Sequence, residues 1–222
     1  AVPWNGLQHM VDTHLDLVRA VGVAAEACRP ILPVSPEARG RMAGRLREAG
    51  AGHPLVVVHA VSRWMFKAWP EAACAEVVRD LAARGASVAL TSGPAAAEQA
   101  AARRIRDLAG VPVLDLSGRT SLAELAAVLA EARLFVGVDS APMHMAAALG
   151  VPVVALFGPS GEHSWGPWGE GHRVVAAPFL CRPCGQAGCL NSKRSHCLEA
   201  IAPAEVVAAA DALLGAPAGR RA

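Results

Sequence analysis

The sequence predicts an α/β protein in which a Rossmann-like parallel sheet carries helices on both faces. From Leu55 onward, short apolar runs alternate with helical patterns, and this alternation is typical of a doubly wound parallel sheet. Of the 222 residues, 53% are hydrophobic and 18% are charged. A chain of this composition can bury a substantial core and is not expected to be disordered.

The first fifty residues contain two helical patterns separated by a proline-rich segment. Residues 5–21 carry apolar positions at helical spacing, and Gly22 is expected to end that helix. Three prolines within residues 29–36 predict an extended linker. Ser35-Pro36-Glu37 is typical of a helix start, and Gly50 is expected to end this second helix.

The remaining elements follow one another in a regular order. Strands are predicted at residues 55–59, 87–90, 111–114, 134–138 and 151–156, and a further strand at 173–175. Helices are predicted at residues 70–83, from the loop 91–94 to about 108, from a capping box at 121–124 to about 130, at 141–149 and at 203–214.

Residues 134–150 are the stretch most indicative of a ligand site. A buried strand ends in the polar turn Asp139-Ser140 and leads directly into a short helix, which either residue can cap. The free N–H groups and the dipole at a helix start favour an anion, most often a phosphate. Because open α/β sheets bind ligands at the carboxyl ends of their strands, the site is expected to include Asp139, Ser140, His144 and Ser160.

Four cysteines near the C-terminal end have metal-site spacing. They are Cys181, Cys184, Cys189 and Cys197. Four thiolates suit a structural zinc or iron, and the alternative is reduced thiols without a metal. The other two cysteines, Cys28 and Cys74, are isolated in the sequence, and disulfides are not expected.

Charge and hydropathy exclude several classes of protein. The net charge is +2, with 21 basic and 19 acidic residues, so no nucleic-acid partner is expected. No apolar run reaches the roughly 18–20 residues of a membrane span, and the first residues lack a signal-peptide pattern. The chain does not begin with methionine and is expected to be a trimmed or partial product. The helix after residue 35 has a basic face, expected to be solvated or to face anionic lipid or acceptor phosphates.

A family resemblance rests on three motifs. Residues 139–150 and Phe157-Gly158-Pro159-Ser160 resemble the donor-binding signature of the bacterial lipopolysaccharide heptosyltransferases, in glycosyltransferase family 9. Residues 62–69 resemble a further hallmark of that family. The likeness runs from about Val56 to Trp168, and more loosely to Leu214. It implies the C-terminal, donor-binding domain of a two-domain GT-B enzyme.

The resemblance also implies a division of the chain. Residues 1–34 would be a remnant of the N-terminal acceptor domain with its linker, residues 35–214 the donor-binding domain, and residues 215–222 a tail. The catalytic base is expected outside this chain, because Asp12 and Asp16 lie in a helical pattern and are interpreted as solvated. The chain alone is therefore expected to bind donor but not to transfer heptose.

Individual roles follow from matched positions. Lys67 and Ser62 would contact the donor phosphates, and Asp139 the donor sugar. Glu98 would lie near the ribose and Thr120 along the adenine. The pyrophosphate would be held by Ser140 and the amides of Ala141 and Met143, with His144 contacting the same ligand. Purely structural alternatives remain: an exposed basic loop for Lys67, a helix first turn for Glu98, and helix caps for Thr120 and Asp139.

The function implied is that of an inverting glycosyltransferase, or its donor-binding half. It would move heptose from ADP-heptose to the lipopolysaccharide inner core, at the cytoplasmic face of the inner membrane and peripheral to it, with no cofactor for catalysis. Three alternatives stay open: a nucleotide-sugar-binding module without activity, a GT-B enzyme using another nucleotide sugar, and a metal-dependent interaction or redox module built on the cysteines.

Overall fold

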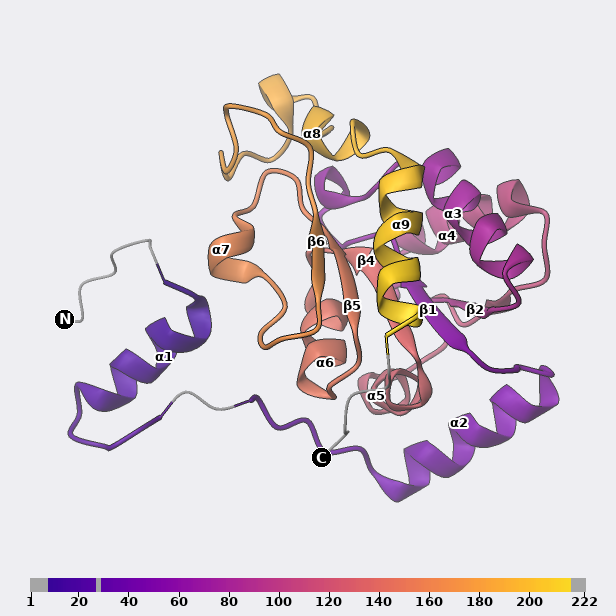
Figure 1. Cartoon of the computed structure of the whole chain (residues 1–222), viewed down its shortest axis with the longest axis horizontal. Helices are drawn as coiled ribbons and strands as arrows, with labels where there is room; N and C mark the ends of the chain where they lie inside the picture. The colour runs from indigo at the N-terminus through magenta and orange to yellow at the C-terminus, as the bar shows by residue number, and fades with distance from the viewer. Residues whose placement is uncertain (1–7, 27–28, 217–222) are drawn as a thin grey trace.

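A six-stranded parallel sheet forms the centre of the computed structural model (Figure 1). The structure describes residues 8–26 and 29–216. Residues 1–7, Cys28 and most of the predicted tail lie outside the described residues. The strands are β1 (Leu55–His59), β2 (Ser87–Leu90), β3 (Leu114–Asp115), β4 (Leu134–Val138), β5 (Val153–Leu156) and β6 (Arg173–Val175).

The strand order is β3-β2-β1-β4-β5-β6, which is the doubly wound arrangement predicted from the sequence. The central strand β1 pairs in parallel with β2 and β4, so that Val57 lies between Ala89 and Phe135. The chain runs outward from β1 to one edge and then returns to β4 to build the other half. Adjacent loops therefore diverge at the carboxyl ends of β1 and β4, where such sheets bind their ligands.

Helices cover both faces of the sheet. The long ones are α2 (Pro36–Glu48), α3 (Glu71–Ala83), α4 (Ala96–Ala109), α5 (Leu122–Glu131), α6 (Ala141–Ala148) and α9 (Pro203–Leu214). The short ones are the 3-10 helices η1 (Met65–Lys67) and η2 (Cys189–Asn191), and the single turns α7 (Glu162–Trp165) and α8 (His196–Glu199). Periodicity in the sequence did not predict these short helices, because three or four residues complete barely one turn.

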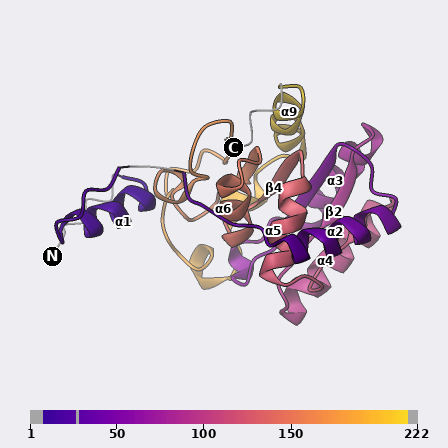
Figure 2. The ribbon, with the colours of Figure 1, turned by 90° about the horizontal axis from the view of Figure 1, so that it is seen from below.

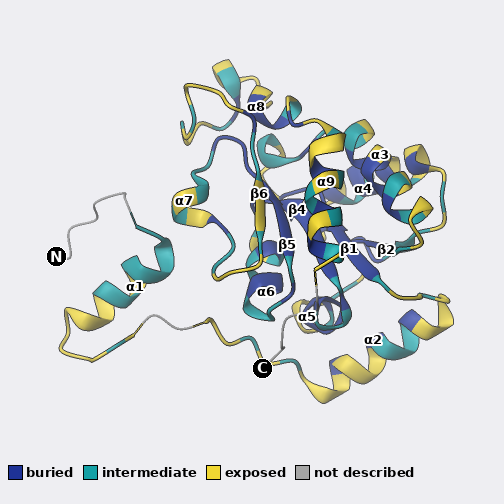
Figure 3. Ribbon diagram, viewed as in Figure 1, coloured by how far each residue is buried: buried dark blue, intermediate teal, exposed yellow. Residues whose placement is uncertain are grey.

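Alternation along the strands divides the core into two layers. Val56 and Val58 of β1 pack in the layer beneath α3, α4 and α9. Leu55 and Val57 point the other way, into the layer beneath α2, α5 and α6. Figure 2 shows α2 and α5 running along one side of the sheet, and Figure 3 shows that the central strands are buried throughout. This two-faced burial explains why β1, β4 and β5 are continuous apolar runs.

The N-terminal helix α1 (Met10–Arg19) lies apart from the sheet and buries none of its residues (Figure 1). His9 holds its start against the domain: Nδ1 accepts from the N–H of Val11 at 3.2 Å, and Nε2 lies 2.9 Å from the Gly166 carbonyl. The His9 ring also contacts the Trp168 ring, with centroids 4.6 Å apart. Helix α1 is thus separate from the sheet, whereas Val34 packs against the core, and the assignment of residues 1–34 to an acceptor domain stays a prediction.

The predicted third strand was placed too early. It was expected at residues 111–114, whereas β3 begins at Leu114 and pairs with Ala89 and Leu90 of β2. Pro112 has no N–H to donate to a ladder. Val111 and Val113 instead pack against the core as part of the connection from α4.

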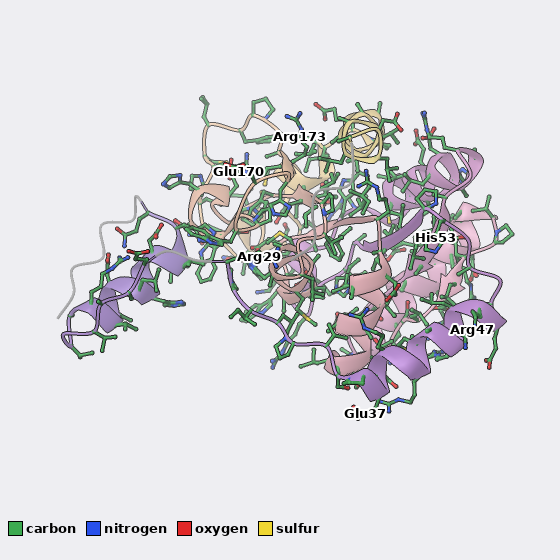
Figure 4. All side chains as sticks on the ribbon, turned by 60° about the horizontal axis from the view of Figure 1, so that its bottom comes forward. Arg29, Glu37, Arg47, His53, Glu170 and Arg173 are labelled. Atoms are coloured by element: carbon green, nitrogen blue, oxygen red, sulfur yellow. The ribbon has the colours of Figure 1, made fainter. Side chains whose placement is uncertain are left out.

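The basic face of α2 is partly an interhelical contact. Arg39 pairs with Glu131 and Arg41 with Glu124, both on α5, at 3.3 and 3.2 Å. Arg47 is exposed, and Figure 4 shows it near one end of α2, with Glu37 at the other end. Within the described part of the chain, no helix is long and apolar enough to span a bilayer.

Candidate functional site

A cavity of about 1020 Å³ opens at the carboxyl ends of β1, β2 and β4. This volume is at the upper end of the roughly 300–1,000 Å³ typical of ligand pockets. Eight of the nine residues predicted to bind the donor line it: Ser62, Lys67, Glu98, Thr120, Asp139, Ser140, Ala141 and His144. The topology thus brings together side chains that are up to 82 positions apart in the sequence, from Ser62 to His144.

Asp139 is the centre of the polar network in this cavity. It follows β4 directly and is 7% exposed. Its Oδ2 accepts a hydrogen bond from Lys67 Nζ at 2.6 Å and another from Ser160 Oγ at 2.6 Å. No described residue donates to Oδ1. The carboxylate is therefore fixed through one oxygen, and the other is available to a ligand hydroxyl.

Lys67 reaches Asp139 from the loop that follows β1. The turn η1 ends at Lys67, and its side chain is 26% exposed. Since an ammonium group has three N–H donors and Asp139 uses one, Lys67 can still donate to a ligand. Ser62, in the same loop, is 6% exposed, and its hydroxyl oxygen accepts from the N–H of Trp64 at 3.2 Å. The hydroxyl hydrogen of Ser62 remains free to donate.

Glu98 takes the helix position expected from the sequence and also faces the cavity, while its contact with a ribose stays a prediction. It lies in the first turn of α4, is 5% exposed and lines the cavity. One carboxylate oxygen accepts from the N–H of Gly93 at 3.1 Å. A Cβ at position 93 would lie 2.7 Å from this carboxylate, so a larger residue there would have to displace the Glu98 side chain.

Thr120 lines the cavity and is not a helix cap. The cap of α5 is Ser121, whose hydroxyl accepts from the N–H of Glu124 at 3.2 Å while the Glu124 carboxylate accepts from Ser121. The predicted capping box is confirmed. The structural alternative for Thr120 was therefore wrong.

The start of α6 differs from prediction in two ways. Neither Asp139 nor Ser140 caps the helix with its side chain, because Ser140 Oγ donates to the Val138 carbonyl at 3.0 Å and Asp139 pairs with Lys67. Met143 is fully buried in the core, and its N–H donates to the Ser140 carbonyl at 3.1 Å. Met143 is thus not available to a pyrophosphate. The N–H groups of Ser140 and Ala141 donate to no described residue and remain free.

Two histidines face the cavity in environments that favour the neutral ring. Burial lowers the pKa of His144, although the Asp139 carboxylate acts in the opposite direction. Burial lowers the pKa of His59 to about 4. His59 Nδ1 lies 2.9 Å from the Thr91 hydroxyl, which itself donates to the Val58 carbonyl.

Sequence reasoning did not assign His59, Trp165 and Leu122 to the site. His59 is the last residue of β1, so its position at a strand's carboxyl end was a usable signal. Trp165 (44% exposed) and Leu122 (73% exposed) also line the cavity. Neither follows a strand directly, and only folding of the loops brings them to it.

The four cysteines do not form a metal site in the structure. Cys181 is exposed, Cys184 and Cys189 are partly buried, and Cys197 is buried; all four are free thiols. Among the described residues, no group of three or more cysteine, histidine or acidic side chains has an arrangement that could hold a metal ion. The zinc or iron indicated by the spacing of the four cysteines stays a prediction.

Comparisons with known proteins agree with this geometry. The model of glycosyltransferase family 9 (heptosyltransferase) matches residues 1–194. Lipopolysaccharide heptosyltransferase 3 of Escherichia coli is 34% identical over 215 residues, which are 96% of this chain and 62% of the relative. The chain thus spans less than two thirds of that relative.

Two solved structures share the fold. The glycosyl transferase family 9 protein of Veillonella parvula DSM 2008 superposes with a TM-score of 0.81 at 21% identity, over 96% of this chain and 62% of its own. The ADP-heptose lipopolysaccharide heptosyltransferase II of E. coli superposes with a TM-score of 0.69 at 25% identity, over 88% of this chain and 56% of its own.

Proposed function

The chain belongs to glycosyltransferase family 9, the heptosyltransferase family, and we propose that it forms the donor-binding part of an inverting heptosyltransferase. The donor would be ADP-heptose and the acceptor the lipopolysaccharide inner core. The observation that carries the proposal is the Lys67–Asp139–Ser160 network beside the free N–H groups of α6. It combines donors for a diphosphate with a carboxylate oxygen for a sugar hydroxyl.

The diphosphate would lie between the loop after β1 and the start of α6. Lys67 supplies positive charge, and Ser62 and the N–H groups of Ser140 and Ala141 supply neutral donors. Bonds from charged donors to phosphate oxygens are the stronger ones. As ADP leaves, negative charge develops on its terminal phosphate. Donors already held in place stabilise that charge without reorganisation.

The nucleoside would occupy the part of the cavity beneath α4 and α5. Glu98 can accept from the ribose hydroxyls, as acidic residues do in dinucleotide-binding folds. Thr120 offers a polar contact, and Leu122 and Leu125 offer apolar surface for a base. The sugar would then extend toward Oδ1 of Asp139.

The proposal must also account for the catalytic base that activates the acceptor hydroxyl. A general base must lie within hydrogen-bond reach of the attacking hydroxyl. The described residues contain a single sheet, whose cavity is accounted for by the donor. We expect the base outside this chain and donor binding without heptose transfer by these 222 residues. We also propose that the enzyme acts at the cytoplasmic face of the inner membrane, in peripheral contact with it.

Titration calorimetry tests the proposal directly. ADP-heptose and ADP should bind the chain more tightly than the UDP and GDP counterparts. A matched assay for heptose transfer to a core acceptor should stay at background. Equal or tighter binding of UDP would reject the proposed donor, and robust transfer would show that the base lies within the chain.

A further inference from the structure

Ser160 is the second partner of the Asp139 carboxylate. It lies in the Gly158-Pro159-Ser160 loop that follows β5, and its hydroxyl donates to Asp139 Oδ2 at 2.6 Å. Lys67 donates to the same oxygen from the loop after β1, which lies on the other side of β4 from β5. Two donors from different loops fix the rotation of the carboxylate about its Cβ–Cγ bond. That rotation decides where Oδ1 points.

The loop carrying Ser160 is held in turn by the cysteine-rich loop, defined here as residues 181–198. The Arg182 side chain, 9% exposed, donates to the Gly158 carbonyl at 2.7 Å and to Glu162 at 2.8 Å. The N–H of Gly185 donates to the Pro159 carbonyl at 2.8 Å. Three consecutive residues of the Ser160 loop are thereby tied to neighbouring structure.

The fit between these loops is close as well as hydrogen-bonded. A Cβ at position 158 would lie 2.5 Å from Leu198, which is itself 1% exposed. The Ser160 loop therefore lies directly against the buried Leu198 side chain of the cysteine-rich loop.

The cysteine-rich loop also holds the Lys67 side of the network. Ser195 is 4% exposed, and its hydroxyl donates to the carbonyl of Phe66 at 2.6 Å. Phe66 immediately precedes Lys67 within η1. One segment thus contacts both loops whose side chains meet on Asp139 Oδ2.

We propose that the cysteine-rich loop is a brace for the donor site, and that Ser160 and Arg182 are positioning residues that orient Asp139 toward the donor sugar. This inference rests on the proposed function, because it assigns the sugar to Oδ1 of Asp139. It gives the loop a role that requires no metal. The residues act through the carboxylate and do not touch the donor. Supporting shells of this kind determine how accurately a binding group is held.

The experiment compares two ligands that differ only in the sugar. ADP-heptose and ADP are titrated into the full 222-residue chain and into Ser160→Ala, Ser160→Thr and Arg182→Met. Threonine keeps the hydroxyl, and methionine keeps much of the length of Arg182 without its donors. Arg194→Met is the matched control, because Arg194 lies in the same loop, is 71% exposed and bonds through its side chain to Glu199. Melting temperatures check that each variant is folded.

Ser160→Ala should weaken ADP-heptose binding roughly tenfold, the loss expected for one charge-assisted bond, and change ADP binding less than about twofold. Arg182→Met should act in the same direction. Ser160→Thr and Arg194→Met should match the unmodified chain. Equal losses for both ligands, no loss for either, or no recovery with threonine would overturn the positioning role. If the unmodified chain binds neither ligand, the proposed function fails and this inference fails with it. If the unmodified chain binds ADP and ADP-heptose but Ser160→Ala binds both equally well, only this inference fails.

Discussion

Replacing Lys67 with alanine tests how the site is organised. In the structure the Lys67 ammonium and the Asp139 carboxylate neutralise each other across 2.6 Å. The variant loses the charge that would meet the diphosphate. It also leaves the Asp139 carboxylate, whose side chain is 9% exposed, without its cation and close to an anionic ligand. Both effects should weaken ADP binding.

The magnitude follows from the hydrogen bond that is lost. A bond to a charged group contributes about 1.5–3 kcal/mol, which corresponds to about a 10- to 150-fold loss of ADP affinity. The unpaired carboxylate adds to this loss. Asp139→Asn should therefore recover part of the affinity in the Lys67→Ala background, so that the two changes are not additive.

Titration calorimetry of ADP against both single variants and the double variant measures this coupling. Lys193→Ala is the matched control, because Lys193 is the only other lysine of the chain and does not line this cavity. Lys67→Arg keeps the charge and should retain most of the affinity. An ADP affinity within about twofold of the unmodified chain for folded Lys67→Ala, or strictly additive effects in the double variant, would refute the reasoning.

Three further predictions concern stability and metal content. Because burial lowers the pKa of His59 to about 4, the unfolded chain binds that proton more readily. The free energy of unfolding should then fall as pH drops from 6.5 to 4, by up to about 1.4 kcal/mol per pH unit. In denaturant titrations, the free energy of unfolding of His59→Asn should depend less steeply on pH than that of the unmodified chain. Parallel curves for the two proteins would contradict this. A Cβ at Gly137 would lie 2.6 Å from the His59 carbonyl, so Gly137→Ala should cost about 1–3 kcal/mol in denaturant unfolding, whereas Gly40→Ala on α2, with no atom within 4 Å, should not destabilise; similar effects at both sites would argue against the steric explanation. Spacing of the four cysteines predicts about one zinc or iron per chain, and elemental analysis of protein purified without chelators decides between that prediction and free thiols.

Local patterns were sufficient to predict most of the elements. The bounds of β1, β2, β4, β6 and α9 were predicted as the structure has them, because apolar runs and capping signals are properties of neighbouring residues. The strand–helix alternation then required a parallel sheet. Signals failed where they were too short or were contradicted by a proline, as at β3 and the single-turn helices.

Which residues form the site was largely predictable, whereas how they interact was not. Strand ends and family motifs identified Lys67, Asp139 and Ser160 separately. Only the tertiary structure showed that Lys67 and Ser160 share one oxygen of Asp139, since they come from the loops after β1 and β5 and meet through the strand order. Met143 illustrates the same limit: its motif indicated a donor amide, but the helical turn at Ser140 uses that amide and the core takes its side chain.

The cysteine-rich loop shows most clearly the difference between what the sequence indicates and what only the tertiary structure decides. Spacing indicated a metal site, because four cysteines at such intervals can reach one ion. The folded chain also places Arg182 and Ser195 against the two loops that hold Asp139, which the spacing did not indicate. Contacts between segments far apart in the sequence depend on packing of the whole domain. No local pattern of residues encodes them.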